Sequence, residues 1–357
     1  MKKSIVASLM SGGIDSSIST FLLSQRKDLN TVGFFLKFWS EDEKEIANKC
    51  CSLESERRAR KIAQILKIPF FVIDLRKEFK KRIVEDFLFF LKRGYTPNPC
   101  VVCNEQIKFG LALEYFLKSG FHFVASGHYA KIIKRKKNKK VFFELHCAKD
   151  KTKDQSYFLY RLTQEKLKRI IFPLANYKRK EVEKIAEDFF PGFFSNIKKS
   201  VDVCFVKSDL SSFLKRTLGE KKGKIFDKNG RFLGYHSGFW FYTIGQRTGL
   251  RLSGGPFFVL KKDVKKNFLI VTRNKKDLIF KKIFLEKVNL LEKIKFPLSL
   301  FVKTRYRQKK KRAKLYFENK RYFLIFEKGI FAPTPGQSAV FYLKDKILGG
   351  GIISKIC

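Results

Sequence analysis

The stretch most suited to chemistry is Leu9-Met10-Ser11-Gly12-Gly13-Ile14-Asp15-Ser16-Ser17, between a short apolar run and a helix-like segment. The two glycines let the backbone approach an anion closely, and the serine hydroxyls and free N–H groups of a helix start can donate hydrogen bonds to it. Asp15 is compatible with a phosphate when Mg²⁺ lies between the two groups. The pattern predicts a nucleotide-phosphate site; the alternative is an ordinary Asp/Ser helix cap after a glycine turn.

Two cysteines, Cys100 and Cys103, follow a turn that is stiffened by the prolines of Thr96–Pro99. We expect a helix to begin near Val101, and its positive end would lower the pKa of a nearby thiol from the free value of about 8.5. The spacing fits a redox pair, half of a zinc site, or one nucleophile with a neighbouring thiol. The chain has no second Cys-x-x-Cys, so zinc would need ligands from elsewhere.

The other cysteines carry less information by themselves. Cys204 lies in an apolar stretch and reads, alone, as a buried core cysteine. Seven cysteines without a regular framework indicate reduced thiols in the cytoplasm. The apolar run Ile5–Met10 is too short for a signal peptide and predicts a buried first strand, and no run approaches the roughly 18 residues of a membrane span.

The first 130 residues alternate between two patterns, which predict a parallel sheet covered by helices on both faces. Short apolar runs predict strands at Ser4–Met10, Thr31–Trp39, Pro69–Leu75 and Phe121–Ser126. Periodic segments predict helices at Ser16–Arg26, Glu43–Leu66, Lys77–Lys92, Val101–Lys118 and Lys178–Phe190. In such sheets, ligands bind at the carboxyl ends of the strands.

The pattern changes after about residue 207. A helix is expected at Leu210–Leu218, then a hairpin at Lys224–Tyr235 that turns at Asn229-Gly230. Short strands from about Phe284 onward predict a small all-β barrel. The basic run Lys131–Lys140 looks like a hairpin tip. We therefore expect an α/β chain with a Rossmann-like nucleotide-binding domain (1–206), a small central domain (207–283) and a C-terminal β-barrel (284–357).

The formal net charge is +44, from 77 Lys and Arg against 33 Asp and Glu. Such an excess attracts polyanions such as nucleic acid. However, the 40 Phe and the preponderance of Lys over Arg also fit the codon usage of an AT-rich genome. The placement of the charge is therefore more informative than its amount.

Together these motifs resemble the tRNA-specific 2-thiouridylases of the ATP pyrophosphatase superfamily. The Ser11–Ser16 loop resembles the Ser-Gly-Gly-x-Asp-Ser loop of that superfamily, whose members cleave ATP to AMP and pyrophosphate. The further matching segments run in the family's order over nearly the whole chain: Thr96–Pro99, Cys103-Asn104, Ile107–Phe109, Ser126–Tyr129, Lys153–Leu159, Thr243–Arg247, Thr304–Gln308 and Thr334–Ser338.

The resemblance implies ATP-dependent 2-thiolation of the wobble uridine in tRNA. The C2 oxygen is adenylated, pyrophosphate leaves, and sulfur from a cysteine persulfide displaces AMP. Cys204 would carry the persulfide, Cys103 would be the second catalytic thiol, and Asp15 would serve the ATP with its Mg²⁺. A sulfur-relay protein or a cysteine desulfurase would deliver the sulfur to a cytoplasmic and monomeric enzyme.

The resemblance also assigns binding residues. Those for ATP would be Leu9, Met10, Ser11, Gly12, Gly13, Ile14, Asp15, Ser16, Leu36 and Gly127. Those for tRNA would be Asn98, Pro99, Cys100, His128, Lys153, Asp154, Gln155, Arg305, Tyr306 and Gln337.

This chain departs from the family's pattern at two places. The family often has an acidic residue where Cys100 stands, and it commonly has Asp-Ser-x-Gly-x before the cysteine where this chain has Ser200–Val203. Three thiols around one site could also hold an iron–sulfur cluster with one open iron, which leaves cluster-dependent thiolation as an alternative. Another ATP pyrophosphatase-type ligase, or an RNA-binding protein that only kept the fold, are the remaining alternatives.

Overall fold

A five-stranded, wholly parallel sheet forms the centre of the N-terminal part, in the order β3-β2-β1-β4-β7. Its strands are β1 (Ser4–Leu9), β2 (Leu29–Lys37), β3 (Phe70–Asp74), β4 (Phe123–Ser126) and β7 (Ile170–Ile171). From β1 the chain winds outward through β2 and β3, then returns to β4 on the other side of β1. The order therefore reverses between β1 and β4, and such switch points open ligand-binding crevices.

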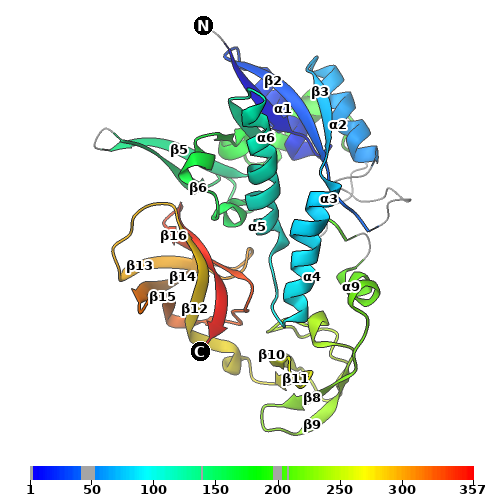
Figure 1. The fold of residues 1–357 in the computed structure, drawn as a ribbon, viewed down its shortest axis with the longest axis vertical. Helices are drawn as coiled ribbons and strands as arrows, with labels where there is room; N and C mark the ends of the chain where they lie inside the picture. The colour runs from blue at the N-terminus through cyan, green and yellow to red at the C-terminus, as the bar shows by residue number, and fades with distance from the viewer. Residues whose placement is uncertain (1–2, 42–52, 138–139, 196–202, 207–208) are drawn as a thin grey trace. The chain divides into compact units, whose positions relative to one another are not determined.

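Helices cover both faces of this sheet (Figure 1). Phe34 and Phe35 are neighbours on β2, so their side chains point to opposite faces. Phe35 packs in one cluster with residues of α1 (Ile14–Ser24), α2 (Leu53–Ile65) and α8 (Arg179–Phe189). On the other face Phe34 lies 4.4 Å, between ring centroids, from Phe116 of α6 (Leu113–Lys118). The predicted two-sided α/β architecture is confirmed.

Two of the predicted helices are built from consecutive short pieces. The first comprises α3 (Arg76–Phe79), η1 (Lys80–Val84) and α4 (Glu85–Lys92), and the second α5 (Pro99–Cys103), η2 (Asn104–Ala112) and α6. The second begins at Pro99, two residues before the predicted start, because proline is favoured at the first helical position. Cys100 therefore lies in the first turn.

A β-hairpin, β5 (Ala130–Lys137) with β6 (Lys140–Cys147), follows the sheet, and residues 345–347 pair with β6. The basic run Lys131–Lys140 thus lies mainly on the two strands rather than in the turn that was expected. Short helices complete this part: η3 (Ser156–Leu159), α7 (Gln164–Leu167) and η4 (Pro173–Asn176).

The next segment contains α9 (Leu210–Leu218), η5 (Phe239–Phe241), η6 (Lys275–Leu278) and four strands in the order β10-β11-β8-β9. The strands are β8 (Gly223–Asp227), β9 (Phe232–His236), β10 (Phe258–Asp263) and β11 (Phe268–Thr272). The predicted hairpin is confirmed as the antiparallel pair β8–β9, with Gly230 at a φ of 86°. Ile225, Leu269 and Val271 are wholly buried in the core of this segment.

The C-terminal part is a closed barrel, as the sequence predicts. Its strands run in the order β12-β15-β14-β13-β16-β17, and β12 also pairs with β17. They are β12 (Ile279–Leu290), β13 (Leu298–Lys303), β14 (Lys311–Glu318), β15 (Arg321–Phe331), β16 (Ser338–Leu343) and β17 (Lys346–Ile356). Leu315, Leu324 and Phe341 fill its interior.

The computed structural model describes residues 3–41, 53–137, 140–195, 203–206 and 209–357. Cys50, Cys51 and the Ser200–Asp202 part of the divergent segment lie outside them. The chain divides into two units: residues 1–84, 99–207 and 345–347, and residues 85–98, 208–344 and 348–357. No helix of the described residues is both long and apolar enough to cross a membrane.

Candidate active site

A cavity of about 310 Å³ lies where β1 and β4 end, at the switch point of the sheet. It collects most residues that the sequence singled out in this unit. Those expected residues are Leu9, Met10, Ser11, Asp15, Ser16, Leu36, Pro99, Cys100, Cys103, Gly127, His128, Gln155 and Cys204. Further lining residues are Phe38, Phe79, Ile83, Asn104, Lys108, Ser126 and Phe158.

The loop after β1 is shaped by a glycine and by serine hydroxyls. Gly12 has a φ of 71°, and a Cβ there would lie 2.1 Å from the backbone oxygen of Ser55, so no other residue fits. The Ser16 hydroxyl accepts a 3.1 Å hydrogen bond from the Ser11 amide and donates one of 2.9 Å to the Gly13 carbonyl. These bonds fold the loop over the first turn of α1, where free backbone N–H groups suit an anion.

Gly127 brings the end of β4 against this loop. Leu9 and Ser126 are paired residues of β1 and β4, so Gly127 comes next to the start of α1. A Cβ on Gly127 would lie 2.7 Å from the carbonyl carbon of Asp15 and 2.8 Å from the Ser16 amide. Glycine is therefore required here by close backbone approach.

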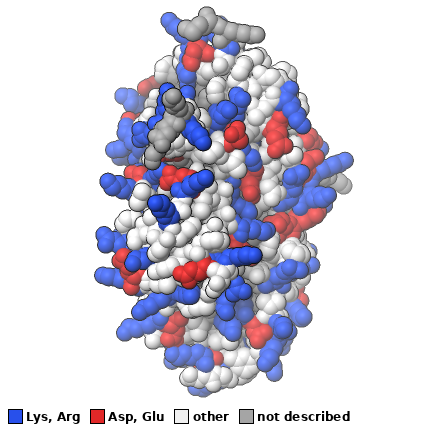
Figure 2. Space-filling model, turned by 60° about the vertical axis from the view of Figure 1, so that its left-hand side comes forward, with Lys and Arg blue, Asp and Glu red and all other residues white. Residues whose placement is uncertain are grey.

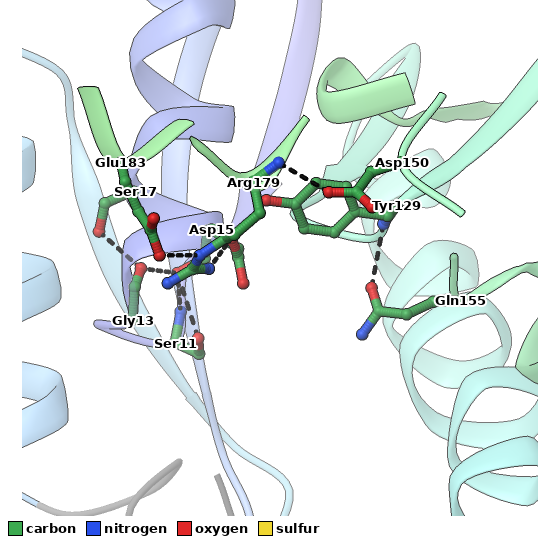
Figure 3. Close-up of polar contacts among 10 residues, drawn as sticks. Ser11, Gly13, Asp15, Ser17, Tyr129, Asp150, Gln155, Arg179 and Glu183 are labelled. Carbon is green, nitrogen blue, oxygen red and sulfur yellow. Dashed lines mark hydrogen bonds and ion pairs between the residues drawn. The ribbon is translucent and has the colours of Figure 1, made fainter. Parts of the chain in front are cut away.

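Asp15 is held by two residues that are distant in sequence (Figure 3). The Tyr129 hydroxyl donates a 2.8 Å hydrogen bond to Asp15 Oδ1, and Arg179 Nη1 forms an ion pair with the same oxygen. Arg179 Nε also donates to Glu183, at 2.7 Å. Burial, and then the negative charge of Asp15, raise the pKa of Tyr129, which stays a protonated donor. The carboxylate is thus fixed at the mouth of the phosphate loop.

Positive charge lies on the same loop and in the cavity. Arg58 Nε donates a 3.1 Å hydrogen bond to the Gly12 carbonyl. Lys108 lines the cavity. Burial, and then the Lys108 charge, hold the pKa of His128 well below its usual value, so its ring is neutral at pH 7. Nδ1 of His128 lies 2.8 Å from the Ser126 hydroxyl, and Nε2 is the second nitrogen of the ring.

The three site thiols line this one cavity, from two separate segments. Cys103 is buried, and Cys100 is half-buried in the first turn of α5. Cys204 lies in a turn that is closed by a 3.2 Å hydrogen bond from the Val206 amide to the Val203 carbonyl. The next residue, Phe205, is buried and lies 5.9 Å, between ring centroids, from Phe79. The structure therefore brings together thiols about a hundred residues apart in sequence.

The described residues do not support a metal centre at these thiols. No group of three or more His, Cys, Asp or Glu side chains within the described ranges is arranged to hold a metal ion. The iron–sulfur and zinc hypotheses therefore gain no support from the geometry of these residues.

The expected RNA contacts of the first unit have different surroundings. Gln155 lines the cavity, while Lys153 is exposed. Asp154 is buried, and its carboxylate accepts hydrogen bonds from the Ala148 amide at 3.0 Å and the Ser156 hydroxyl at 2.9 Å. Asp154 thus shapes the loop that presents its two neighbours.

The expected contacts of the second unit are tied into the protein itself. Arg305 Nη2 donates to the carbonyls of Ile244 and Ala332, at 2.8 and 2.9 Å. Gln337 Nε2 donates a 3.0 Å hydrogen bond to the Thr96 carbonyl, two residues before Asn98. Tyr306 is half-buried. Arg305 and Gln337 are therefore held in defined positions by main-chain oxygens.

Comparison with known proteins places this chain in a family. It matches three family models, described as a tRNA methyl transferase HUP domain over residues 4–208, a tRNA methyl transferase PRC-barrel domain over 211–273 and an aminomethyltransferase beta-barrel domain over 280–353. It is 39% identical over 361 residues to "tRNA-specific 2-thiouridylase MnmA 2" of Thermoanaerobacter sp. (strain X514), covering 98% of each chain. The chain belongs to the tRNA-specific 2-thiouridylase family.

Other family members are similarly close. The chain is 39% identical to the MnmA of Syntrophomonas wolfei, over 98% of this chain and 99% of that one, and 38% identical to that of Buchnera aphidicola, over 99% and 96%. Among solved structures, the "U34-tRNA thiolase NcsA from Methanococcus maripaludis with its [4Fe-4S] cluster" matches with a TM-score of 0.35 and 18% identity, covering 60% of this chain and 66% of that one. So low a TM-score adds nothing about the site of this family member.

Sequence reasoning missed four charged or polar residues of this family member's site. Tyr129 and Lys108 lie inside segments that matched the family, but nothing there indicated what they contact. Arg58 and Arg179 gave no signal, because an arginine in a helix usually lies on a solvated face. Only the packing of α2 and α8 beside α1 brings them to the phosphate loop.

The high net charge is not by itself informative about the site. Figure 2 shows Lys and Arg over the whole visible face, with Asp and Glu between them. The excess of lysine thus fits the compositional explanation at least as well as a functional one.

Proposed function

We propose that the protein uses ATP to replace the C2 oxygen of the wobble uridine in tRNA by sulfur. The observation that carries this proposal is the single cavity lined both by the phosphate loop, at Ser11 and Asp15, and by the thiols Cys103 and Cys204. A nucleotide-activating site and two sulfur nucleophiles within one cavity are the minimum for activation followed by sulfur transfer.

The phosphate loop would hold ATP. Its serines and the α1 N-terminus would bind the phosphates, and Leu36 and Gly127 would line the nucleotide site. Asp15 would hold Mg²⁺ against the pyrophosphate group. Arg179 holds the Asp15 carboxylate in its orientation through their ion pair. Lys108 and Arg58 offset negative charge that develops on the α-phosphate or on the leaving pyrophosphate.

The reaction would proceed in three steps. The uridine C2 oxygen attacks the α-phosphorus of ATP and pyrophosphate leaves. The terminal sulfur of a Cys204 persulfide attacks C2, and the C2–O bond breaks as AMP departs. Cys103 thiolate then attacks the Cys204 sulfur, leaving sulfur on C2 and a Cys103–Cys204 disulfide, which a thiol reductant reopens.

The same scheme implies the partners. The uridine would be flipped out of the tRNA near Asn98–Cys100, and the neutral His128 ring and Gln155 would contact it. Lys153 and Tyr306 face RNA, and Arg305 and Gln337 support the surface on which it binds. A sulfur-relay protein or a cysteine desulfurase supplies the persulfide to a monomeric cytoplasmic enzyme with the domains 1–206, 207–283 and 284–357.

The test is the fate of ATP in the presence of tRNA and a persulfide donor. Purified protein with [α-³²P]ATP should form AMP together with 2-thiouridine in digested tRNA, and omission of tRNA should abolish both. Asp15→Ala should remove this activity with an unchanged melting temperature, whereas Asp28→Ala, at an exposed surface pair, serves as the matched control. Release of ADP instead of AMP would rule out the assignment of the loop.

A further inference from the structure

Two adjoining hollows mark the segment between residues 227 and 274, in the second unit. The first, the Arg247 hollow, measures about 410 Å³ and is lined by Arg247, Gly249, Leu250, Arg251, Leu252, Gly255, Pro256 and Phe257. The second, the Arg231 hollow, measures about 290 Å³ and is lined by Asp227, Lys228, Asn229, Arg231, Leu233, Phe257, Val271, Thr272, Arg273 and Asn274. They share Phe257 as a common wall.

Arg273 connects the two hollows. Its guanidinium carbon lies 4.9 Å from the centroid of the Phe257 ring, a cation–π contact that fixes the direction of the side chain. A Cβ on Gly254 would lie 3.0 Å from Arg273 Nη2, so the guanidinium also rests against the loop of the Arg247 hollow. The two hollows therefore form one surface with a positive group at its middle.

The composition of this surface differs from that of the chain. The chain has 57 Lys and 20 Arg, yet the two hollows are lined by four arginines and one lysine. Drift toward AT-rich codons enriches lysine and cannot explain a local excess of arginine. Guanidinium groups bind phosphate with two parallel hydrogen bonds, which the ammonium group of lysine cannot do.

These arginines are available to a ligand. Among the described residues, no carboxylate forms an ion pair with Arg231, Arg247, Arg251 or Arg273, all of which are exposed. The one acidic lining residue, Asp227, accepts hydrogen bonds from the Asn229 and Arg231 amides through Oδ1, at 2.9 Å each. The lining lysine Lys228 pairs with Asp277 at 3.0 Å, and Glu220 interacts electrostatically with Arg251. The net positive charge of the surface is therefore carried by its arginines.

The walls indicate which polyanion fits. Single-stranded RNA is usually held by bases stacked on exposed aromatic rings. Among the described residues, Phe257 is the only aromatic side chain that lines the hollows, and it is only 7% exposed. A paired RNA stem is instead recognised through its phosphates and its shape. We propose that this surface binds backbone phosphates of a double-helical stem of the tRNA. The inference rests on the proposed function, to which it adds a second RNA contact.

The experiment compares full-length variants of equal charge change. Arg247→Gln/Arg251→Gln tests the first hollow, and Lys314→Gln/Lys328→Gln is the control, because both lysines are exposed on the barrel of the same unit. Affinity for a tRNA transcript is measured at several salt concentrations, together with kcat and KM for 2-thiolation. The arginine pair should weaken binding about tenfold and lower the salt slope by about 1.4–1.8, the value for two phosphates.

The remaining readouts separate the explanations. KM for tRNA should rise while kcat and the melting temperature stay unchanged, and Arg247→Lys/Arg251→Lys should retain the salt slope but recover only part of the affinity. If the Arg247→Gln/Arg251→Gln variant binds tRNA as tightly as the lysine control, the proposed RNA-binding surface is wrong, even when the wild type thiolates tRNA normally. A wild type that binds tRNA through these arginines but forms no 2-thiouridine overturns the proposed function and leaves the surface standing.

Discussion

The Tyr129 hydroxyl donates a 2.8 Å hydrogen bond to Oδ1 of Asp15, which is 114 residues away and also pairs with Arg179. Tyr129 lies between β4 and β5, Asp15 is in the first turn of α1, and Arg179 starts α8. The carboxylate that would hold Mg²⁺ is therefore positioned by three separate elements on one edge of the sheet. Its orientation depends on tertiary packing and not on the phosphate loop alone.

This network makes the first prediction. Tyr129→Phe should lower the rate of AMP formation by about tenfold and Arg179→Gln by roughly 10- to 100-fold, because a neutral and a charged hydrogen bond to Asp15 are lost. Glu183→Gln is the control, since it removes another partner of Arg179 and leaves the Asp15 pair in place. Steady-state AMP release with saturating tRNA measures the effect, and an Arg179→Gln variant with normal kcat and normal KM for ATP would contradict it.

The second prediction separates the thiols. Cys103→Ala and Cys204→Ala should each abolish 2-thiouridine formation, while Cys100→Ala should keep much of it, because the relay needs only two sulfurs. Nucleoside mass spectrometry after aerobic and anaerobic reactions gives the readout. Activity that appears only after anaerobic reconstitution with iron, and that Cys100→Ala destroys, would replace the relay by a cluster.

The third prediction contrasts Lys153, which is proposed to face RNA, with Arg305, which is proposed to support the surface on which RNA binds. Lys153→Ala should reduce tRNA affinity and lower the salt slope by about 0.7–0.9, the value for one phosphate, without changing stability. Arg305→Ala should weaken binding and also lower the melting temperature, because the carbonyls of Ile244 and Ala332 lose their shared donor. Thermal unfolding and tRNA binding, measured on the same samples, test this contrast. Equal melting temperatures for the two variants would contradict the supporting role of Arg305.

The fourth prediction concerns Lys262, whose Nζ is buried and has no hydrogen-bond partner among the described residues. Burial lowers the pKa of this amine from 10.5 to about 7. Below pH 7 the ammonium is charged in both states, and between pH 7 and 10.5 only the unfolded chain holds the extra proton, so stability rises with pH across that window. Lys262→Met should raise the free energy of unfolding at pH 6 by roughly 1–3 kcal/mol, since each pKa unit is worth about 1.4 kcal/mol and relaxation relieves part of the cost.

Denaturant unfolding at pH 6, 8 and 9.5 checks this sign. The difference between wild type and Lys262→Met should shrink as pH rises. Lys261→Met, at the exposed neighbouring position, should show no such dependence. A Lys262→Met difference that stays constant with pH would mean that the amine does not titrate in this range.

Much of the fold could be predicted from sequence because local pattern decides it. Short apolar runs predicted β1 to β4, and Asn229-Gly230 predicted the β8–β9 turn. The start of the second long helix was predicted two residues late, since the residues that follow Pro99 show the periodicity and the proline itself does not. The basic run Lys131–Lys140 was predicted to be a hairpin tip, and a hairpin is present there, but its strands extend further into the run than the charge pattern indicated.

The site was predicted in part for the same reason. Ser11–Ser16 and Cys103 belong to local motifs, and the family resemblance added Cys204 and Gly127. Arg179 and Arg58 act through contacts with residues far away in the chain, which no local pattern encodes. The internal hydrogen bonds of Arg305 and Asp154 could likewise not be predicted from the sequence, because the positions of their acceptors and donors are known only from the structure.

The central claim is that the uridine C2 oxygen is adenylated and leaves with AMP. The direct measurement uses tRNA carrying ¹⁸O at C2 of the wobble uridine, a single turnover with ATP and persulfide-loaded protein, and mass spectrometry of the released AMP. The account predicts one ¹⁸O atom in the AMP phosphate for each 2-thiouridine formed. AMP free of ¹⁸O alongside normal 2-thiouridine formation would contradict it.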